Sequence, residues 1–505
     1  MTTHHPFCFG SVRRAVFALA AFSAASCHGG SENAQGAPDD AQIADDSPPI
    51  LVTSPTTGSD ATACDEIGPG GVGCSEVDAA SASALGGDAG LDGGGLICGS
   101  GSIPCAGVCV PDDVNNCGAC GGACPTQTNA TAVCNASDAG SYTCGSSCLA
   151  GFSACGGACV DLTSDVANCG ACGQGCAPGA CSAGQCQPWL VAQADNTVAQ
   201  MGRVTLGIDG HNLVWIDPDE GVSEAPLVPP VPNAVPIVLA SPTTTVDSFG
   251  EIAMANGVIA WTEVDQMYGL NLWTALEGQA GSGSTSNLPA ASGCTGSGLT
   301  LNTTGTAAYF ILACGAGGDL FGCSLGGAIM CSSLTSAGEQ SYSSGNDVAF
   351  SSNYVFLTDS AAATVGQYSV ASATASAIET DQGTPFLLTV DSSYVYWAST
   401  GPDLTFTISR TSQANPTSPP EPVLSATGGT VTGIATDGTN LYLSAEVNDG
   451  DTRIGVIGSV PVGGGTLTNL YSGMELPLAV ATADGVVAWM NGNNYGLYAL
   501  RLPLP

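Results

Sequence analysis

The sequence predicts a mainly β protein in which a seven-bladed β-propeller follows a disordered tether and a disulfide-rich, loop-dominated tandem module. Between residues 187 and 505, a hairpin-like pattern that ends in an aromatic residue recurs seven times, at intervals of 41–48 residues. Between Cys98 and Cys186, sixteen cysteines fall into two copies of one spacing. Repeat periods in the forties are typical of four-stranded propeller blades, and such a cysteine density is typical of a disulfide scaffold.

Residues 1–26 have the pattern of a signal peptide. Arg13 and Arg14 precede an apolar run of eight residues, which is too short to span a bilayer as a stable helix. Small residues then lead into Cys27, and this stretch resembles a bacterial lipobox with Ala24 at the position usually held by Leu. The resemblance implies that Cys27 is lipidated and anchors the chain to a membrane. Ordinary cleavage beside an unpaired Cys27 is the alternative.

Residues 27–97 are expected to form a disordered linker behind the lipid anchor. Their composition is dominated by Ala, Gly, Ser, Asp and Pro, with few large apolar side chains. Such a segment cannot bury enough apolar surface to offset its conformational entropy. A coil of about 70 residues spans roughly 45–50 Å, which suits a tether that holds a folded head away from a membrane.

The tandem module is predicted to span residues 98–186, as one copy at 98–147 and a second at 148–186. The strongest echo between the copies pairs residues 113–121 with residues 165–173. Spacing alone does not determine which cysteines pair. The expected disulfide framework consists of Cys98, Cys105, Cys109, Cys117, Cys120, Cys124, Cys134, Cys144, Cys148, Cys155, Cys159, Cys169, Cys172, Cys176, Cys181 and Cys186.

The second copy carries Cys-Val-Asp-Leu at residues 159–162, then Asp165, then an Asn-Cys-Gly-x-Cys-Gly-x-x-Cys run at residues 168–176. In these motifs it resembles the stigma-specific protein family of plants and related cysteine-rich modules of secreted bacterial proteins. The resemblance implies a small extracellular module rather than a catalyst. The first copy departs from the motif at Pro111 and Asp112, and both copies lack an adjacent Cys-Cys pair.

Zinc binding is the alternative use of these cysteines. Four thiolates in Cys-x2-Cys pairs have the spacing of a zinc site. Sixteen cysteines behind a signal peptide instead favour disulfides and export from the cytosol.

The repeats of the region 187–505 favour seven blades, with six or eight as alternatives. Alternating apolar residues around Asp-Gly turns are a β-hairpin signal, and the clearest copies are 207–215, 390–397 and 434–442. The segment around Tyr396 and Trp397 resembles a Tyr-Trp-Thr-Asp or NHL-type propeller. The repeat aromatics, expected to be interblade core together with Met267 and Met490, are Trp215, Trp261, Tyr309, Phe356, Trp397, Tyr442 and Trp489.

Two further features belong to this region. Residues 189–192 are expected to form a strand that pairs into the last blade and closes the ring. The third repeat contains Cys294, Cys314, Cys323 and Cys331, which predicts one or two local disulfides.

The chain is strongly acidic. It has 43 acidic residues, six arginines and no lysine, for a net charge of −37. Without a basic patch the chain is not expected to bind nucleic acid, and anionic lipid headgroups would repel it. Contact with a membrane is therefore expected through the N-terminal lipid only.

Calcium is the one cofactor that the acidic loops suggest. The candidate ligands are Asp217 and Asp219 in one loop and Asp449 and Asp451 in another. Neither loop has a full calcium-binding pattern, and a solvated acidic surface is the alternative.

No catalytic residue is assigned. Gly322, Ser324 and Gly326 match a nucleophile elbow, but no histidine follows His211 to act as its base. Lysine chemistry is excluded because the chain has no lysine. A tryptophan synthase α-chain activity would need an α/β barrel with regular helices, which the pattern does not predict. Carboxylate-dependent cleavage is the enzymatic route that stays open.

These features together predict a cell-surface lipoprotein. Its propeller would be a recognition head for protein or glycan, with the tandem module as a rigid spacer. The alternatives are an extracellular, carboxylate-dependent propeller hydrolase or lyase, and a structural envelope protein without a discrete ligand. The expected location is the bacterial outer membrane or cell surface, with secretion or the periplasm as alternatives.

Overall fold

The computed structural model describes residues 97–503 apart from fifteen gaps. The gaps are 138–140, 195–205, 210, 218–220, 228–234, 242–245, 266–268, 289–293, 315–316, 336–346, 402–404, 417, 450–451, 475 and 493. The predicted signal peptide, Cys27, Met267 and nearly all of the predicted linker therefore lie outside the described residues. Every regular element that is described is a β-strand, and no helix there is long and apolar enough to cross a membrane.

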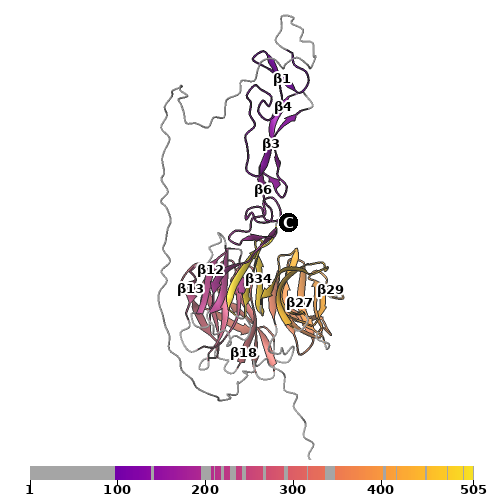
Figure 1. The fold of residues 1–505 in the computed structure, drawn as a ribbon. Helices are drawn as coiled ribbons and strands as arrows, with labels where there is room; N and C mark the ends of the chain where they lie inside the picture. Colours follow the sequence, from indigo (N-terminus) through magenta and orange to yellow (C-terminus); the bar gives the residue numbers. More distant parts are fainter. Residues whose placement is uncertain are drawn as a thin grey trace, which may run out of the picture. The chain divides into compact units, whose positions relative to one another are not determined.

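Seven four-stranded antiparallel sheets form the propeller, which confirms the predicted fold class (Figure 1). Blade 1 consists of β10 (Leu206–Ile208), β11 (Asn212–Asp217), β12 (Gly221–Pro226) and β13 (Ile237–Ala240). Blade 2 consists of β14 (Val246–Ala255), β15 (Val258–Asp265), β16 (Gly269–Leu276) and β17 (Ser284–Asn287). Blade 3 consists of β18 (Cys294–Leu301), β19 (Ala307–Cys314), β20 (Gly317–Ser324) and β21 (Met330–Ser333).

The remaining blades repeat this order. Blade 4 consists of β22 (Val348–Ser351), β23 (Tyr354–Asp359), β24 (Thr364–Ser369) and β25 (Thr374–Glu379). Blade 5 consists of β26 (Thr384–Val390), β27 (Tyr394–Thr400), β28 (Thr405–Ser412) and β29 (Glu421–Thr427). Blade 6 consists of β30 (Gly429–Thr436), β31 (Asn440–Asp449), β32 (Thr452–Pro461) and β33 (Thr468–Met474). Blade 7 consists of β34 (Pro477–Ala483), β35 (Val486–Asn491), β36 (Gly496–Arg501) and β9 (Trp189–Gln193).

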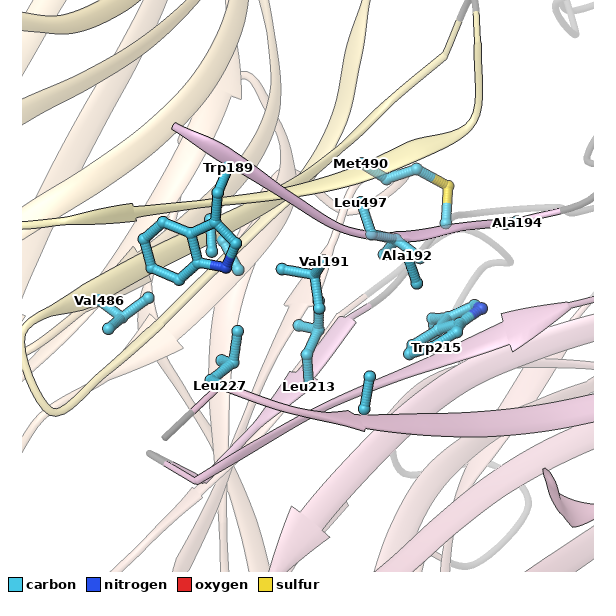
Figure 2. Packing of buried hydrophobic residues seen from close by; sticks show 13 residues of the cluster. Trp189, Val191, Ala192, Ala194, Leu213, Trp215, Leu227, Val486, Met490 and Leu497 are labelled. Atoms are coloured by element: carbon cyan, nitrogen blue, oxygen red, sulfur yellow. The ribbon is translucent and has the colours of Figure 1, made fainter. Parts of the chain in front are cut away.

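The ring is closed by joining the two ends of the propeller sequence in one blade. Strand β9 pairs antiparallel with β36, with Trp189 opposite Ala499 and Gln193 opposite Gly496. This confirms the strand predicted at residues 189–192. Figure 2 shows Trp189 and Val191 of β9 packed between Val486 of blade 7 and the strands of blade 1. Full burial of a valine side chain such as that of Val191 stabilises a fold by about 1.5–3 kcal/mol.

The seven repeat aromatics all lie on the second strand of their blades, and all are buried. Their hydrophobic clusters extend from one blade into the next. Tyr442 of blade 6 packs with Trp489 of blade 7, and Phe356 of blade 4 packs with Trp397 of blade 5. The aromatics therefore form the interblade core, as predicted, because neighbouring sheets bury their large side chains against each other. Met490 is also buried, in the cluster of Figure 2.

A β-bulge recurs on the innermost strand of five blades, which sequence patterning did not predict. In each case one extra residue interrupts the pairing with the second strand. A bulge bends its strand and redirects the local side chain. The extra residues are Gly298, Phe386, Thr432 and Leu478, and in blade 2 Gly250 and Glu251 together stand opposite Thr262.

The region 98–186 contains four short hairpins and eight disulfides, which confirms the prediction of disulfide bonds in this segment. The hairpins are β1 (Ser102–Cys105) with β2 (Val108–Pro111), β3 (Ala130–Ala136) with β4 (Tyr142–Cys148), β5 (Ser153–Cys155) with β6 (Ala158–Val160), and β7 (Cys181–Ser182) with β8 (Gln185–Cys186). Strand β4 ends at Cys148, the first cysteine of the second copy, so no linker separates the copies.

The two copies have the same disulfide connectivity. Numbered along each copy, the first cysteine pairs with the third, the second with the fifth, the fourth with the seventh and the sixth with the eighth. The pairs of the first copy are Cys98–Cys109, Cys105–Cys120, Cys117–Cys134 and Cys124–Cys144. Those of the second are Cys148–Cys159, Cys155–Cys172, Cys169–Cys181 and Cys176–Cys186.

Candidate functional site

The innermost strands of all seven blades line an axial cavity of about 320 Å³. Its wall is formed mainly by small and aliphatic residues, with the hydroxyl side chains of Thr389, Thr432, Thr436 and Thr482. Two carboxylates, Glu251 and Asp347, also line it, and both residues are buried. Buried carboxylates beside a cavity are the residue type that ligand binding or acid–base chemistry would use.

These two carboxylates bind backbone groups of neighbouring blades. Glu251 of blade 2 accepts a hydrogen bond from the Leu299 N–H of blade 3, at 3.3 Å. Asp347, which directly precedes β22 of blade 4, accepts one from the Leu388 N–H of blade 5, at 2.7 Å, and one from the Val348 N–H, at 2.9 Å. Hydrogen bonds to a charged acceptor contribute about 1.5–3 kcal/mol each. Both side chains therefore act as interblade ties at the wall of the cavity.

In blades 5 and 6, an aspartate stabilises the turn that joins the innermost strand to the second strand. In blades 5 and 6, one oxygen of Asp391 or Asp437 accepts two backbone N–H groups of the turn. The other oxygen accepts the hydroxyl of Tyr396 or Tyr442, at 2.7 and 2.8 Å. Burial, followed by the hydrogen bond to the aspartate, raises the pKa of both tyrosines. These motifs, which are among the clearest repeats in the sequence, are structural turns.

Blade 1 departs from this arrangement. Asp209 accepts the N–H groups of His211 and Asn212, each at 2.9 Å, but Val214 occupies the position of the tyrosine. The carboxyl of Asp209 instead forms a hydrogen bond with the carboxyl of Glu277 in blade 2. The Asn212 side-chain amide also donates to Glu277.

A third carboxylate completes this group. Both oxygens of Glu224, on β12, accept the Gly278 N–H, at 3.1 and 3.0 Å. Burial raises the pKa of Glu224, and the nearby charge of Asp209 adds to this effect. Burial, followed by the hydrogen bond with Asp209, raises the pKa of Glu277. For Asp209, burial raises the pKa, but its hydrogen bonds, first of all that with Glu277, lower it to below its usual value.

Sequence reasoning missed this acidic group. Asp209 lies in a recognised repeat, but Glu224 and Glu277 lie 15 and 68 residues further along the chain. Only the packing of blade 1 against blade 2 brings them together.

The predicted calcium ligands are not brought together by any described contact. Asp219 and Asp451 lie outside the described residues. Asp217 and Asp449 are the last residues of β11 and β31, and their side chains also lie outside the described part of the chain. Calcium binding by these loops stays a prediction.

The cysteines of the Cys-x2-Cys pairs bind different partners. Cys117 pairs with Cys134, whereas Cys120 pairs with Cys105. Two sets of three sulfur atoms come together within the described residues, and every member is already in a disulfide. The sets are Cys117, Cys124 and Cys144, and Cys169, Cys176 and Cys186.

Residues 322–324 of the nucleophile-elbow motif end strand β20, and Leu325 and Gly326 begin the loop that leads to β21. Ser324 is the last residue of β20 and pairs with Ala307 and Met330 on the flanking strands. Its neighbour Cys323 is bonded to Cys331, and Cys294 is bonded to Cys314, so the third repeat contains two local disulfides. A strand within a sheet does not present the sharp strand-to-helix turn that exposes a catalytic serine.

No protein-family model matches the chain, and no curated protein matches its sequence. Solved structures similar to it include the β-propeller domain of Cps50 (Swd1) from Myceliophteria thermophila, with 9% identity and a TM-score of 0.42 over 61% of this chain and 99% of that one. TolB from Acinetobacter baumannii has 8% identity and a TM-score of 0.37 over 59% and 65%. BamB from Moraxella catarrhalis has 9% identity and a TM-score of 0.36 over 60% and 83%. Likenesses this distant add nothing to what the strand pairing shows.

Proposed function

We propose that this chain is an exported binding protein whose propeller recognises a protein partner, with a glycan as the alternative ligand. The observation that supports it most is the closure of the ring. Strand β9 closes it, and the buried carboxylates Glu251 and Asp347 tie neighbouring blades together. A rigid scaffold that carries loops at its ends suits recognition, because little conformational freedom is lost on binding.

Export is supported by the ten disulfides of the described residues, because disulfides persist in oxidising compartments and are rare in the cytosol. We infer further that lipidated Cys27 anchors the mature chain to the bacterial outer membrane or cell surface. Residues 28–97 would act as the tether between the lipid and the folded part. Metabolic labelling with a radioactive fatty acid tests this, and Cys27→Ser should abolish both the label and membrane fractionation.

The tandem module fits the role of a rigid spacer. Its two copies share one connectivity and join at Cys148 without a linker. Its last disulfide, Cys176–Cys186, ends three residues before Trp189, the first residue of the closing strand. The Gln174 side chain also donates a hydrogen bond to the Leu502 carbonyl, at 3.1 Å. These contacts couple the second copy to blade 7.

The binding function is tested with the purified full-length protein. We expect saturable binding to one fraction of envelope or secreted proteins, measured by biolayer interferometry, and protease treatment of that fraction should remove it. Binding that survives protease and is lost after glycosidase treatment would identify a glycan ligand instead. Saturable binding to neither class would contradict the proposal and favour a structural envelope role.

A second candidate is a carboxylate-dependent hydrolase or lyase, and one observation favours it. Glu251 and Asp347 line the same axial cavity, so two carboxylates face one space. Turnover on a panel of glycans, lost in both Glu251→Gln and Asp347→Asn while the folded β-signal stays intact, would support this activity. Retained turnover in both variants would exclude this pair.

A further inference from the structure

Two disulfides of the first module copy lie side by side. The sulfur of Cys117 lies within 4.8 Å of both sulfurs of the Cys124–Cys144 disulfide. Cys117 is itself bonded to Cys134. The remaining gap is small beside the reach of a cysteine side chain that changes rotamer. A thiolate formed on one of these disulfides therefore has the other within reach, because exchange proceeds by direct attack of one sulfur on another.

The hairpin β3–β4 holds two of these cysteines in position for a different bond. Cys134 and Cys144 stand directly opposite each other on the two strands, yet each is bonded to a cysteine of the preceding turn. Directly opposite residues have Cα atoms about 4.5–5.5 Å apart, within the range of about 4.4–6.8 Å that disulfides span. The protein already contains two bonds between directly opposite cysteines, in blade 3, at Cys294–Cys314 and Cys323–Cys331.

Cys144 is the member of the group of three close sulfurs that an external thiol can reach. It is exposed, whereas Cys117 is 9% and Cys124 8% exposed. A thiolate that attacks a disulfide needs access to one of its two sulfurs. Cys144 is therefore the point of entry.

We propose that the first copy contains a thiol–disulfide exchange site whose reactant is a small external thiol. The thiol causes the disulfides Cys117–Cys134 and Cys124–Cys144 to exchange partners. The products are Cys117–Cys124 and Cys134–Cys144. This inference does not depend on the ligand of the propeller.

Three substitutions at sulfur accomplish the exchange. The external thiolate attacks Cys144, the Cys124–Cys144 bond breaks, and Cys124 leaves as a thiolate. The Cys124 thiolate attacks Cys117, the Cys117–Cys134 bond breaks, and Cys134 leaves as a thiolate. The Cys134 thiolate then attacks Cys144 and expels the external thiolate. Each step breaks one S–S bond and forms another, so there is no net oxidation or reduction and the thiol is regenerated.

The exchange changes which parts of the first copy are cross-linked. Two of its four disulfides join residues 98–124 to the hairpin β3–β4, and the other two lie within residues 98–124. After the exchange, every disulfide of the copy lies either within residues 98–124 or within the hairpin. Residues 125–129 then connect two parts that no disulfide joins. For the spacer role proposed above, the exchange therefore supplies a hinge.

The second copy has the same connectivity, but its group of close sulfurs is less accessible. Cys169 is 3% and Cys176 0% exposed. Cys186 is partly buried and packs against the cluster that contains Trp489 and Leu502 of blade 7. Attack there first requires local opening of this packing. The second copy is therefore a control within the same molecule.

The test incubates the oxidised full-length protein with reduced glutathione in the absence of oxygen, at a pH near the thiol pKa of about 8.5. Samples are quenched in acid, which stops exchange because it protonates the thiolates. Free thiols are then alkylated, the protein is digested with pepsin in acid, and mass spectrometry maps the disulfides.

We expect the Cys134–Cys144 bond to appear in the wild type together with an equal amount of the Cys117–Cys124 bond. The corresponding bond of the second copy, Cys181–Cys186, should be about tenfold or more less abundant, because its formation requires local opening. Limited proteolysis should cleave residues 125–129 faster after the exchange.

A variant tests the close approach of the sulfurs without any external thiol. Cys134→Ser leaves Cys117 as a thiol beside the Cys124–Cys144 disulfide, so Cys117 should form bonds with Cys124 and Cys144. Cys98→Ser is the matched control, because it leaves Cys109 as a thiol that belongs to neither group of close sulfurs. The share of Cys117 that forms new bonds should be several times that of Cys109.

Three results with the wild type would overturn the proposal, whether or not the variants fold. Loss of the Cys124–Cys144 bond without a Cys134–Cys144 bond would show simple reduction. Equal exchange in the two copies would show that general unfolding, rather than access at Cys144, controls the reaction. An unchanged disulfide map would show that the external thiol does not reach Cys144, and it would leave the spacer role intact.

Discussion

The phenol of Tyr442 donates a 2.8 Å hydrogen bond to the carboxylate of Asp437, five residues earlier at the turn between β30 and β31. The same contact joins Tyr396 to Asp391 at 2.7 Å in the preceding blade. In both, the ring of the tyrosine is buried while its hydroxyl closes the turn. A single aspartate thereby links the local conformation of a turn to the core between blades.

Removal of this hydroxyl should destabilise the propeller. Tyr442→Phe leaves the Asp437 carboxylate without one of its donors, and we expect a loss of about 1.5–3 kcal/mol in the free energy of unfolding. Urea denaturation followed by tryptophan fluorescence measures this. Tyr354→Phe is the control, because the described residues show no hydrogen bond to its hydroxyl. Equal stability of Tyr442→Phe and the wild type would show that the turn does not depend on this contact.

The carboxyl pair of blades 1 and 2 should make stability depend on pH. The pKa of Glu277 in the folded protein is raised above its ordinary value of 4.5, so the folded state binds this proton more tightly than the unfolded state. The resulting stabilisation is complete below pH 4.5 and is lost as the pH rises through the raised value. Glu277→Gln resembles the protonated form at every pH. It should therefore be more stable than the wild type at neutral pH, with a difference that shrinks on acidification.

Thermal unfolding of the two proteins across this pH range measures the difference. Glu224, whose pKa burial also raises, is present in both proteins, so its direct contribution largely cancels. Asp381→Asn, at an exposed carboxyl, should show no such trend. A difference that stays constant with pH, or grows on acidification, would contradict the assignment.

Closure of the ring should depend on β9. Val191 is fully buried between blades 7 and 1, and Val191→Asp would place a carboxylate without a cationic partner in that apolar cluster. We expect a loss of about 3 kcal/mol or more, visible as a lower urea midpoint and weaker near-ultraviolet circular dichroism. Gln193→Ser, which removes one exposed hydrogen bond of the same strand to the Asn494 carbonyl, should cost far less. Similar urea midpoints for the two variants would mean that the stability of blade 7 does not depend on β9.

Reducing agent should separate the two regions. Each module disulfide contributes about 2–4 kcal/mol, and the hairpins of residues 98–186 bury few large apolar side chains other than the cystines. The blades, in contrast, contain extended hydrophobic clusters. Under mild reduction, limited proteolysis with mass spectrometry should find new cleavage sites in 98–186 first, while the β-signal of the propeller persists. Simultaneous cleavage in both regions would show that they unfold as one unit.

Local patterns predicted much of this fold. The alternation around Asp-Gly and Asn-Gly turns places a strand on each side of the turn, and the recurring aromatic supplies the buried side chain that each blade packs against its neighbour. The closing strand could be predicted for the same reason, because a ring of seven similar sheets leaves the apolar run at residues 189–192 one free edge to pair with. The cysteine spacing likewise showed that the tandem module consists of two equivalent copies.

Other features are contacts between residues far apart in the chain, and the spacing of motifs along the sequence does not predict such contacts. Eight cysteines per copy allow many pairings, and only the folded hairpins bring Cys117 to Cys134. The elbow-like sequence around Ser324 forms the end of β20 and the loop to β21, because strands on both sides of β20 pair with it and no helix follows. Asp209 and Glu277 meet because blade 1 packs on blade 2. Periodicity specifies which residues repeat, whereas contacts between blades arise from how each sheet twists and packs, which is a property of the whole ring.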